Sequence, residues 1–128
     1  MRRMIEARDK GAPEVAIWGS GKPRRELMFV DDAADAIAFV LERYSAAEPI
    51  NIGIGVDVSI RELAEITAQV VGYCGSLTFD ASKPDGAPRR LLDSTRLAAL
   101  GWRASTQLAD GLAQMYRWYC NDKMNAAA

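Results

Sequence analysis

The sequence predicts a small α/β lobe that packs against a larger domain. Segments with helical periodicity alternate with short apolar segments typical of strands. Capping residues and glycines mark where the helices start and stop, and they indicate about four to five helices. No strand candidate is a long hydrophobic run of the kind that forms the centre of a parallel sheet. The 128 residues suit one domain, but the expected core is thin.

The first elements are a helix and a strand. Residues 1–10 place apolar side chains among charges and look like the last turns of a helix, which Gly11 and Pro13 end. Residues 14–18 (EVAIW) are predicted to form a strand, and residues 19–23 the loop that follows it.

The next predicted elements are a strand, a helix and a strand. The strands are residues 27–30 and 49–52. Between them, Asp31 or Asp32 is expected to cap a helix that runs to about residue 44. Its apolar face is expected to consist of Ala34, Ile37, Ala38 and Leu41.

A capping box gives the clearest helix signal. Ser59 and Glu62 have the Ser-x-x-Glu spacing in which each side chain bonds the other residue's backbone amide. The helix is expected to run to Val71 and to end at Gly72. Leu63, Ile66, Thr67 and Val70 are expected on one face.

The last third of the chain is predicted to contain one strand and two helices. The strand is 77–79, a loop rich in proline and glycine follows at 82–90, and 90–92 can extend. Residues 95–100 form a short helix that Gly101 stops, and residues 108–121 form the last helix. Leu112, Met115, Tyr116 and Tyr119 are expected to point inward. We expect one lobe over 1–122 and a frayed tail over 123–128.

Composition excludes several classes of function. No apolar run is long enough to span a bilayer and no signal peptide opens the chain, so we expect a cytoplasmic protein without membrane contact. The chain has no histidine, which excludes His-based metal sites and Ser-His or Cys-His catalysis within it. Cys74 and Cys120 show neither CxxC nor metal spacing and are interpreted as two reduced thiols, with no metal bound.

Charge is unevenly distributed along the chain. Basic residues dominate 1–25 and 83–103, whereas acidic residues dominate 26–80. The two basic blocks would form an anion-binding site if folding brings them together. A nucleic-acid footprint would need a larger basic surface, and the sequence pI of 5.5 argues against a nucleic-acid partner.

Two motifs suggest a dinucleotide enzyme only superficially. Gly53-x-Gly55 follows a predicted strand, but Val58 stands where the fingerprint needs a third glycine, so a turn into the capped helix is the better interpretation. Tyr119-x-x-x-Lys123 has the spacing of a short-chain dehydrogenase pair, but it lies at the end of the last helix and is interpreted as chance. No cofactor-binding or catalytic residue is therefore assigned to this chain.

One constellation of residues favours a ligand with phosphates. Trp18 offers a flat apolar face, and arginines bind phosphate with two bonds and also stack on rings. The arginines come in adjacent pairs, which are Arg2 and Arg3, Arg24 and Arg25, and Arg89 and Arg90. Together they suit a nucleotide or a nucleotide-sugar pyrophosphate. The alternative, in which Trp18 belongs to the core and the arginines are solvated, stays open at this point.

Three long segments resemble the C-terminal part of GDP-L-fucose synthases. They are WGSGKPRRELMFVDDAADAI, INIGIGVDVSIRELAEI, and FDASKPDGAPRRLLD followed by LGW, and the similarity runs in order from Met1 to about Tyr119. Those enzymes are NADP-dependent epimerase/reductases of the extended short-chain dehydrogenase type. The resemblance implies an α/β substrate-binding lobe from which the Rossmann domain is absent.

The resemblance implies four substrate-binding residues. Trp18 and Arg25 match positions that contact the GDP-sugar, and Arg3 matches a basic residue at the substrate cleft. Arg90 stands where the family usually has lysine, which keeps the charge but changes the geometry. The roles of Arg2, Arg24 and Arg89 stay open.

The resemblance does not extend to the part of the family that carries the catalytic residues. The family's NADP(H) site and its catalytic Ser, Tyr, Lys, Cys and His lie in the part that this sequence does not match. We therefore expect a GDP-sugar-binding portion that is inactive alone and either shortened or a fragment. The alternatives are a stand-alone sugar-nucleotide-binding module and a non-catalytic remnant. Either a fragment or a remnant could self-associate through the apolar face left by the missing domain.

Overall fold

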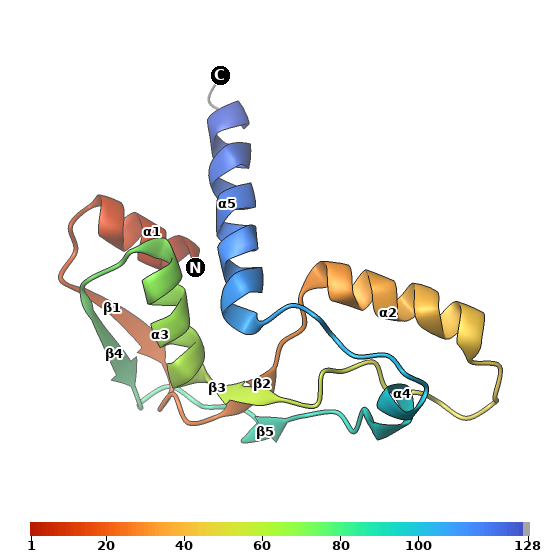
Figure 1. Cartoon of the computed structure of the whole chain (residues 1–128). Helices are drawn as coiled ribbons and strands as arrows, with labels where there is room; N and C mark the ends of the chain where they lie inside the picture. Colours follow the sequence, from red (N-terminus) through yellow and green to blue (C-terminus); the bar gives the residue numbers. More distant parts are fainter. Residues whose placement is uncertain (127–128) are drawn as a thin grey trace.

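A computed structural model describes the backbone of residues 1–126 and the side chains of residues 1–122. It is a mixed α/β arrangement of helices and short strands (Figure 1). The elements in chain order are α1 (Arg2–Asp9), β1 (Glu14–Trp18), β2 (Arg24–Glu26), α2 (Val30–Arg43), β3 (Asp57–Ser59), α3 (Ile60–Val71), β4 (Ser76–Asp80), β5 (Arg89–Arg90), α4 (Thr95–Ala99) and α5 (Leu108–Ala126).

The strands form two small sheets. β1 pairs in parallel with β4, and in the second sheet β2 lies between antiparallel β3 and parallel β5. Figure 1 shows α1 and α3 beside the β1–β4 pair, the second sheet in the lower centre, and α2 with α4 on the opposite side. The second sheet therefore joins two helical parts of the molecule.

Two separate hydrophobic clusters stabilise these two parts. The first contains Val15, Val71 and Tyr73 together with buried residues of α1 and α3, and Tyr116 and Tyr119 of α5 pack against it. The second is small and contains Ala36, Leu97 and Trp102. The expectation of a thin core is consistent with this division.

The strand predictions were right for the first sheet and mostly wrong for the second, where the segment expected to extend at 90–92 overlaps β5 at Arg90. The strand at 14–18 is confirmed, and the one at 77–79 lies within β4. The strand expected at 27–30 is instead β2, at Arg24–Glu26, and residues 49–52 are not a strand. β2 consists of charged residues only, so hydrophobic alternation does not reveal it, and its pairing with β3 and β5 fixes its position.

Helix α2 is confirmed, but its expected cap and inward face are wrong. Phe29 is the N-cap residue and makes no side-chain cap bond. Asp32 is buried and instead accepts hydrogen bonds from Ser105 and Thr106, just before α5. The predicted inward face is exposed, with Ile37 52% and Leu41 80% accessible, while Ala36 packs against the second cluster.

Helix α3 forms as the capping box predicts. The Ser59 and Glu62 side chains bond each other's backbone amides, and Gly72 ends the helix with a left-handed φ of 71°. Its buried residues are Ala64, Thr67, Ala68 and Val71, so the predicted face is right at Thr67 and shifted elsewhere.

The last two helices also form where expected. α4 matches the helix predicted at 95–100, and α5 begins at Leu108. α5 continues to Ala126 and so includes most of the tail expected to be frayed, while residues 127–128 lie outside the described part. Met115 is 44% exposed rather than inward. Among the described residues, no helix is both long and apolar enough to cross a membrane.

Candidate functional site

Strand β2 divides two neighbouring arginines between the faces of the second sheet. Successive side chains of a strand point to opposite faces. Arg24 pairs in register with Arg89 of β5, and Arg25 pairs with Arg90. Arg24 and Arg89 therefore share one face, and Arg25 and Arg90 share the other.

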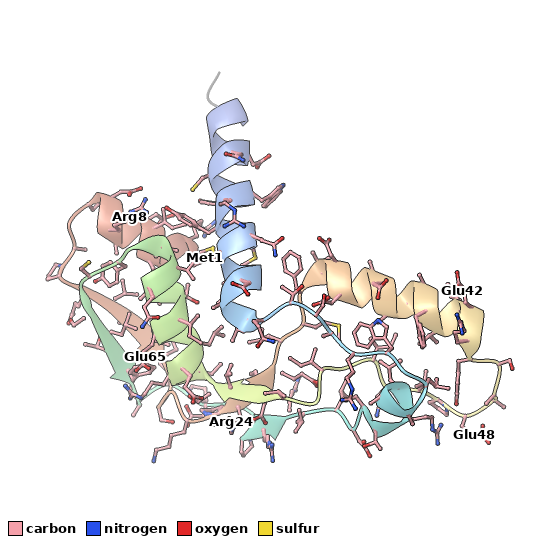
Figure 2. The ribbon with its side chains drawn as sticks, in the orientation of Figure 1. Met1, Arg8, Arg24, Glu42, Glu48 and Glu65 are labelled. Carbon is pink, nitrogen blue, oxygen red and sulfur yellow. The ribbon has the colours of Figure 1, made fainter. Side chains whose placement is uncertain are left out.

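The first of these faces is closed by a carboxylate. Asp57 of β3 accepts hydrogen bonds from the Nε atoms of both Arg24 and Arg89, and its side chain is 4% exposed. Arg24 also lies 3.5 Å from the Glu62 carboxylate. The hydrogen bonds from Arg89 and then Arg24 hold the pKa of Asp57 below its usual range. Figure 2 labels Arg24 next to the second sheet. These two arginines, whose roles the sequence left open, are structural.

The other face carries arginines without a carboxylate partner. Arg25 donates through Nη1 to the carbonyl oxygens of Arg24 (2.7 Å) and Ala87 (2.8 Å), so it holds the loop before β5. Arg90 is exposed. Among the described residues, neither guanidinium lies within 4 Å of a carboxylate. Their positive charges are therefore available to an anion.

Trp18 and Arg3 form the other half of the candidate site, at β1. Trp18 is the last residue of that strand and is 71% exposed, which excludes the alternative in which it belongs to the core. Arg3 of α1 donates to the carbonyl of Ala16, two residues before Trp18 (2.6 Å). Arg2 instead faces Glu6 in an exposed ion pair. The structure thus places the four predicted residues as two pairs, one at β1 and one on the β2–β5 face.

Two loops connect these pairs. Residues 19–23 lead from β1 to β2, and residues 81–88 lead from β4 to β5, so two parallel strand pairs are joined by two loops that run in the same direction. Asp85 in the second loop accepts hydrogen bonds from the backbone N–H (2.6 Å) and the side-chain hydroxyl (2.7 Å) of Ser20 in the first. Gly19 has a φ of 88°, and a Cβ there would lie 2.4 Å from the Asp85 carboxylate. The glycine allows this close approach.

Glu26 organises the segment that resembles a dinucleotide fingerprint. Its carboxylate accepts the backbone N–H groups of Ile54 (2.6 Å), Gly55 (2.7 Å) and Leu92 (2.9 Å). The capping box occupies the first turn of α3. Because backbone N–H groups of this kind would have to hold a pyrophosphate, the segment does not fit NADP(H). Gly55 has a left-handed φ of 71°, but β3 lies between it and α3, so the predicted turn directly into that helix is wrong.

Two concave regions flank the second sheet. One, of about 410 Å³, is lined by Arg25 and by apolar residues that include Ile54, Val58 and Ile66. The other, of about 670 Å³, lies between the start of α2 and α5 and is mostly apolar, with Phe29, Val30 and Trp118 in its wall. The first continues the Arg25 face, whereas the second is an apolar surface without a partner in the described residues.

Candidate metal ligands do not cluster in the described part of the chain. No group of three or more His, Cys, Asp or Glu side chains there is arranged to hold a metal ion. Cys74 and Cys120 are free thiols, as the spacing indicates.

Comparison with known proteins gives a broad similarity first. Residues 1–53 match the model of the NAD dependent epimerase/dehydratase family. A GDP-mannoheptose C4 reductase from Campylobacter jejuni with NADP bound has a TM-score of 0.80 and 34% identity, and the match covers 92% of this chain and 42% of that one. The chain is thus similar in sequence and fold to about two fifths of that reductase.

The more specific similarity is to GDP-L-fucose synthases, as the three sequence segments indicate. The chain is 54% identical to GDP-L-fucose synthase 1 of Arabidopsis thaliana over 125 residues, which are 98% of this chain and 39% of that protein. A GDP-L-fucose synthetase from Naegleria fowleri bound to NADP shares the fold, with a TM-score of 0.89 at 22% identity over 96% of this chain and 39% of that one. The chain therefore spans about 40% of the length of the relatives it matches.

Sequence reasoning missed three residues that shape the candidate site. They are Asp57, Glu26 and Asp85, all carboxylates that bind backbone or arginine donors. Paired arginines at 24–25 and 89–90 were a usable signal, because neighbouring guanidinium groups repel and an anion between them relieves that repulsion. The distant carboxylate itself could not be identified without the strand register.

Proposed function

We propose that this chain is the GDP-sugar-binding part of a GDP-L-fucose synthase-like, NADP-dependent epimerase/reductase. The observation that carries the proposal is the division of arginines on the second sheet. Arg24 and Arg89 are both bonded to the Asp57 carboxylate, whereas Arg25 and Arg90 face away from it and have no carboxylate partner among the described residues. Similarity to GDP-L-fucose synthases supports a GDP-sugar as the anion.

The four predicted residues have distinct roles in this proposal. Arg25 and Arg90 bind the pyrophosphate, since guanidinium groups match phosphate oxygens with paired hydrogen bonds. Trp18 stacks its exposed ring on a ring of the ligand, and Arg3, fixed by the Ala16 carbonyl, supplies a further positive charge beside it.

The chemistry of such an enzyme requires groups that this chain does not provide. In the full-length family, bound NADP(H) supplies the hydride for reduction. The Gly53–Gly55 segment does not fit that cofactor, because Glu26 occupies its amides. We propose that this chain binds and orients the substrate, and that it is inactive without a cofactor-binding domain. Orientation of the substrate supplies a large share of the rate enhancement of an enzyme.

Calorimetric titration with GDP and then GDP-mannose tests the binding. We expect saturable binding that Arg90→Ala weakens about tenfold, the effect of one charge-assisted hydrogen bond. Arg43→Ala, at the far end of α2, is the matched control and should bind like the wild type. Absence of binding by the folded wild-type chain would contradict the proposal.

A complementation assay separates the fragment from the stand-alone module. Adding the cofactor-binding domain of a relative should give NADPH-dependent reduction of a GDP-4-keto sugar, and the domain alone should not. GDP binding without any restored reduction would favour the stand-alone binding module instead.

We also propose that the apolar surface between α2 and α5 is where the rest of such an enzyme packs, and that it self-associates when uncovered. Val30 is 69% and Trp118 64% exposed, and both line the groove of about 670 Å³. Exposed apolar patches of this kind mark interaction sites. Sedimentation should show concentration-dependent assembly that Trp118→Glu abolishes. A monomer at all concentrations, or assembly that Trp118→Glu leaves intact, would contradict it.

A further inference from the structure

Lys83 holds its ammonium group beside the exposed ring of Trp18. The Nζ atom lies 5.8 Å from the centroid of that ring, within the range of a cation–π contact. The Lys83 side chain is exposed, but the backbone that leads into it is held by two hydrogen bonds. The Lys83 N–H donates to the Asp80 carbonyl (3.1 Å), and the Asp80 carboxylate accepts the N–H of Ser82 (3.0 Å).

The charge of Lys83 is not neutralised by a carboxylate. Among the described residues, no acidic oxygen lies within 4 Å of its ammonium group. The carboxylate of Asp85, two residues further on, is directed to Ser20 instead. A group that stacks on Trp18 would therefore carry its attached phosphates next to an uncompensated ammonium.

Asp85 connects the two halves of the candidate site. It joins the loop that carries Lys83 to the loop between Trp18 and Arg25, and its bonds to the Ser20 hydroxyl and amide keep its pKa below the usual range. Further along the same loop, the Arg24 N–H donates to the Pro88 carbonyl (2.8 Å), and the Arg25 guanidinium donates to the Ala87 carbonyl. The second loop is thus fixed at Asp80, at Asp85 and at 87–88.

We propose that Lys83 is an additional phosphate-binding residue of this site and that Asp85 is the positioning residue that holds its loop in place. The ligand class is a nucleoside diphosphate or its sugar ester, whose ring stacks on Trp18 and whose phosphates meet Lys83 together with Arg25 and Arg90. The inference rests on the proposed function and assigns two residues to that site.

Paired ligands with and without phosphate test Lys83. Lys83→Met keeps the aliphatic stem and removes the charge, so it should weaken GDP binding about tenfold and leave binding of uncharged guanosine unchanged. Lys10→Met, at the end of α1, should alter neither. If the wild type binds GDP and Lys83→Met binds it equally well, the assignment of Lys83 is wrong and the proposed function stands. If the wild type binds no GDP, both fail.

Amide hydrogen exchange tests Asp85 without any ligand. Asp85→Ala should speed exchange at Ser20 and also at Arg24, whose N–H bonds the far end of the same loop, while the amides of α3 stay protected. Glu42→Ala, which removes an exposed carboxylate at the far end of α2, should change none of these. In the GDP titration Asp85→Ala should weaken binding, and adding Lys83→Met to it should cost less than it does in the wild type. Exchange that changes at Ser20 alone, or fully additive losses, would overturn the positioning role.

Discussion

Arg24 and Arg89 lie side by side on neighbouring parallel strands and bind the same carboxylate, that of Asp57. Two guanidinium groups placed next to each other repel unless an anion lies between them. Asp57 supplies this anion from β3, so one residue holds all three strands of the second sheet together. The sheet that carries Arg25 and Arg90 thus depends on a residue on its opposite face.

Replacing Asp57 should therefore make the protein less stable and less sensitive to acid. The pKa of Asp57 lies below its ordinary value of 3.8, so its stabilising effect is complete above that pH and is lost as the pH falls through the lowered pKa. Thermal unfolding should show Asp57→Asn melting lower than the wild type at neutral pH, with the two curves converging in acid. A difference that stays constant down to strong acid would contradict the ion pairs.

The carboxylate of Glu26 should also contribute to stability, because it bonds two segments that follow β2 in the chain. Glu26→Gln replaces one acceptor oxygen by a donor, which cannot bond the N–H groups of Ile54, Gly55 and Leu92 together. We expect a loss of about 2 kcal/mol in the free energy of unfolding, measured in urea. Glu42→Gln, on the exposed end of α2, is the control and should lose almost nothing. Equal losses in the two variants would mean that the three bonds do not matter.

Arg25 and Arg90 should respond differently to removal although both face the candidate site. Arg25 also holds the Ala87 carbonyl, so Arg25→Ala should lower both the melting temperature and the affinity for GDP. Arg90→Ala should lower the affinity about tenfold and leave the melting temperature unchanged. Parallel melting and titration of the two variants check this. Equal melting temperatures for both would show that the Arg25 contact to the loop contributes nothing.

The cap of α3 allows a simple stability test. Ser59→Ala removes the acceptor for the Glu62 N–H and should cost about 1 kcal/mol, measured by chemical denaturation. Ser45→Ala, on the exposed segment after α2, should be neutral. No loss at Ser59 would mean that packing alone determines where α3 begins.

The sequence was most informative where the determinants of structure are local. The Ser59–Glu62 box and Gly72 lie within or next to one helix, and both were correctly interpreted. β2 could not be found in this way, because three charged residues become a strand only through partners far away in the chain. For the site, adjacent arginines could be recognised as a pattern, but only the strand register shows which member of each pair binds a carboxylate.

Helix α2 shows a second reason why a prediction from the sequence was wrong. The apolar stripe of Ile37 and Leu41 was correctly recognised as hydrophobic and wrongly placed inside. A periodic pattern shows which side of a helix avoids water, but it does not show that the covering partner belongs to the same chain. In this structure the stripe is exposed, and the small Ala36 makes the close contact with the second cluster.

The parallel pairing of β1 with β4 and of β2 with β5 has a consequence for biosynthesis. Neither pair is a hairpin, so the parallel partner of each early strand is synthesised much later. The Ser20–Asp85 contact between their loops joins residues 65 positions apart. Contacts between residues so far apart slow folding, because the chain loses the entropy of closing the loop before the contacts form and stabilise it. On the ribosome, β1 therefore emerges without its partner and β2 has only β3 beside it, so their exposed edges are open to mispairing until β4 and β5 have left the exit tunnel.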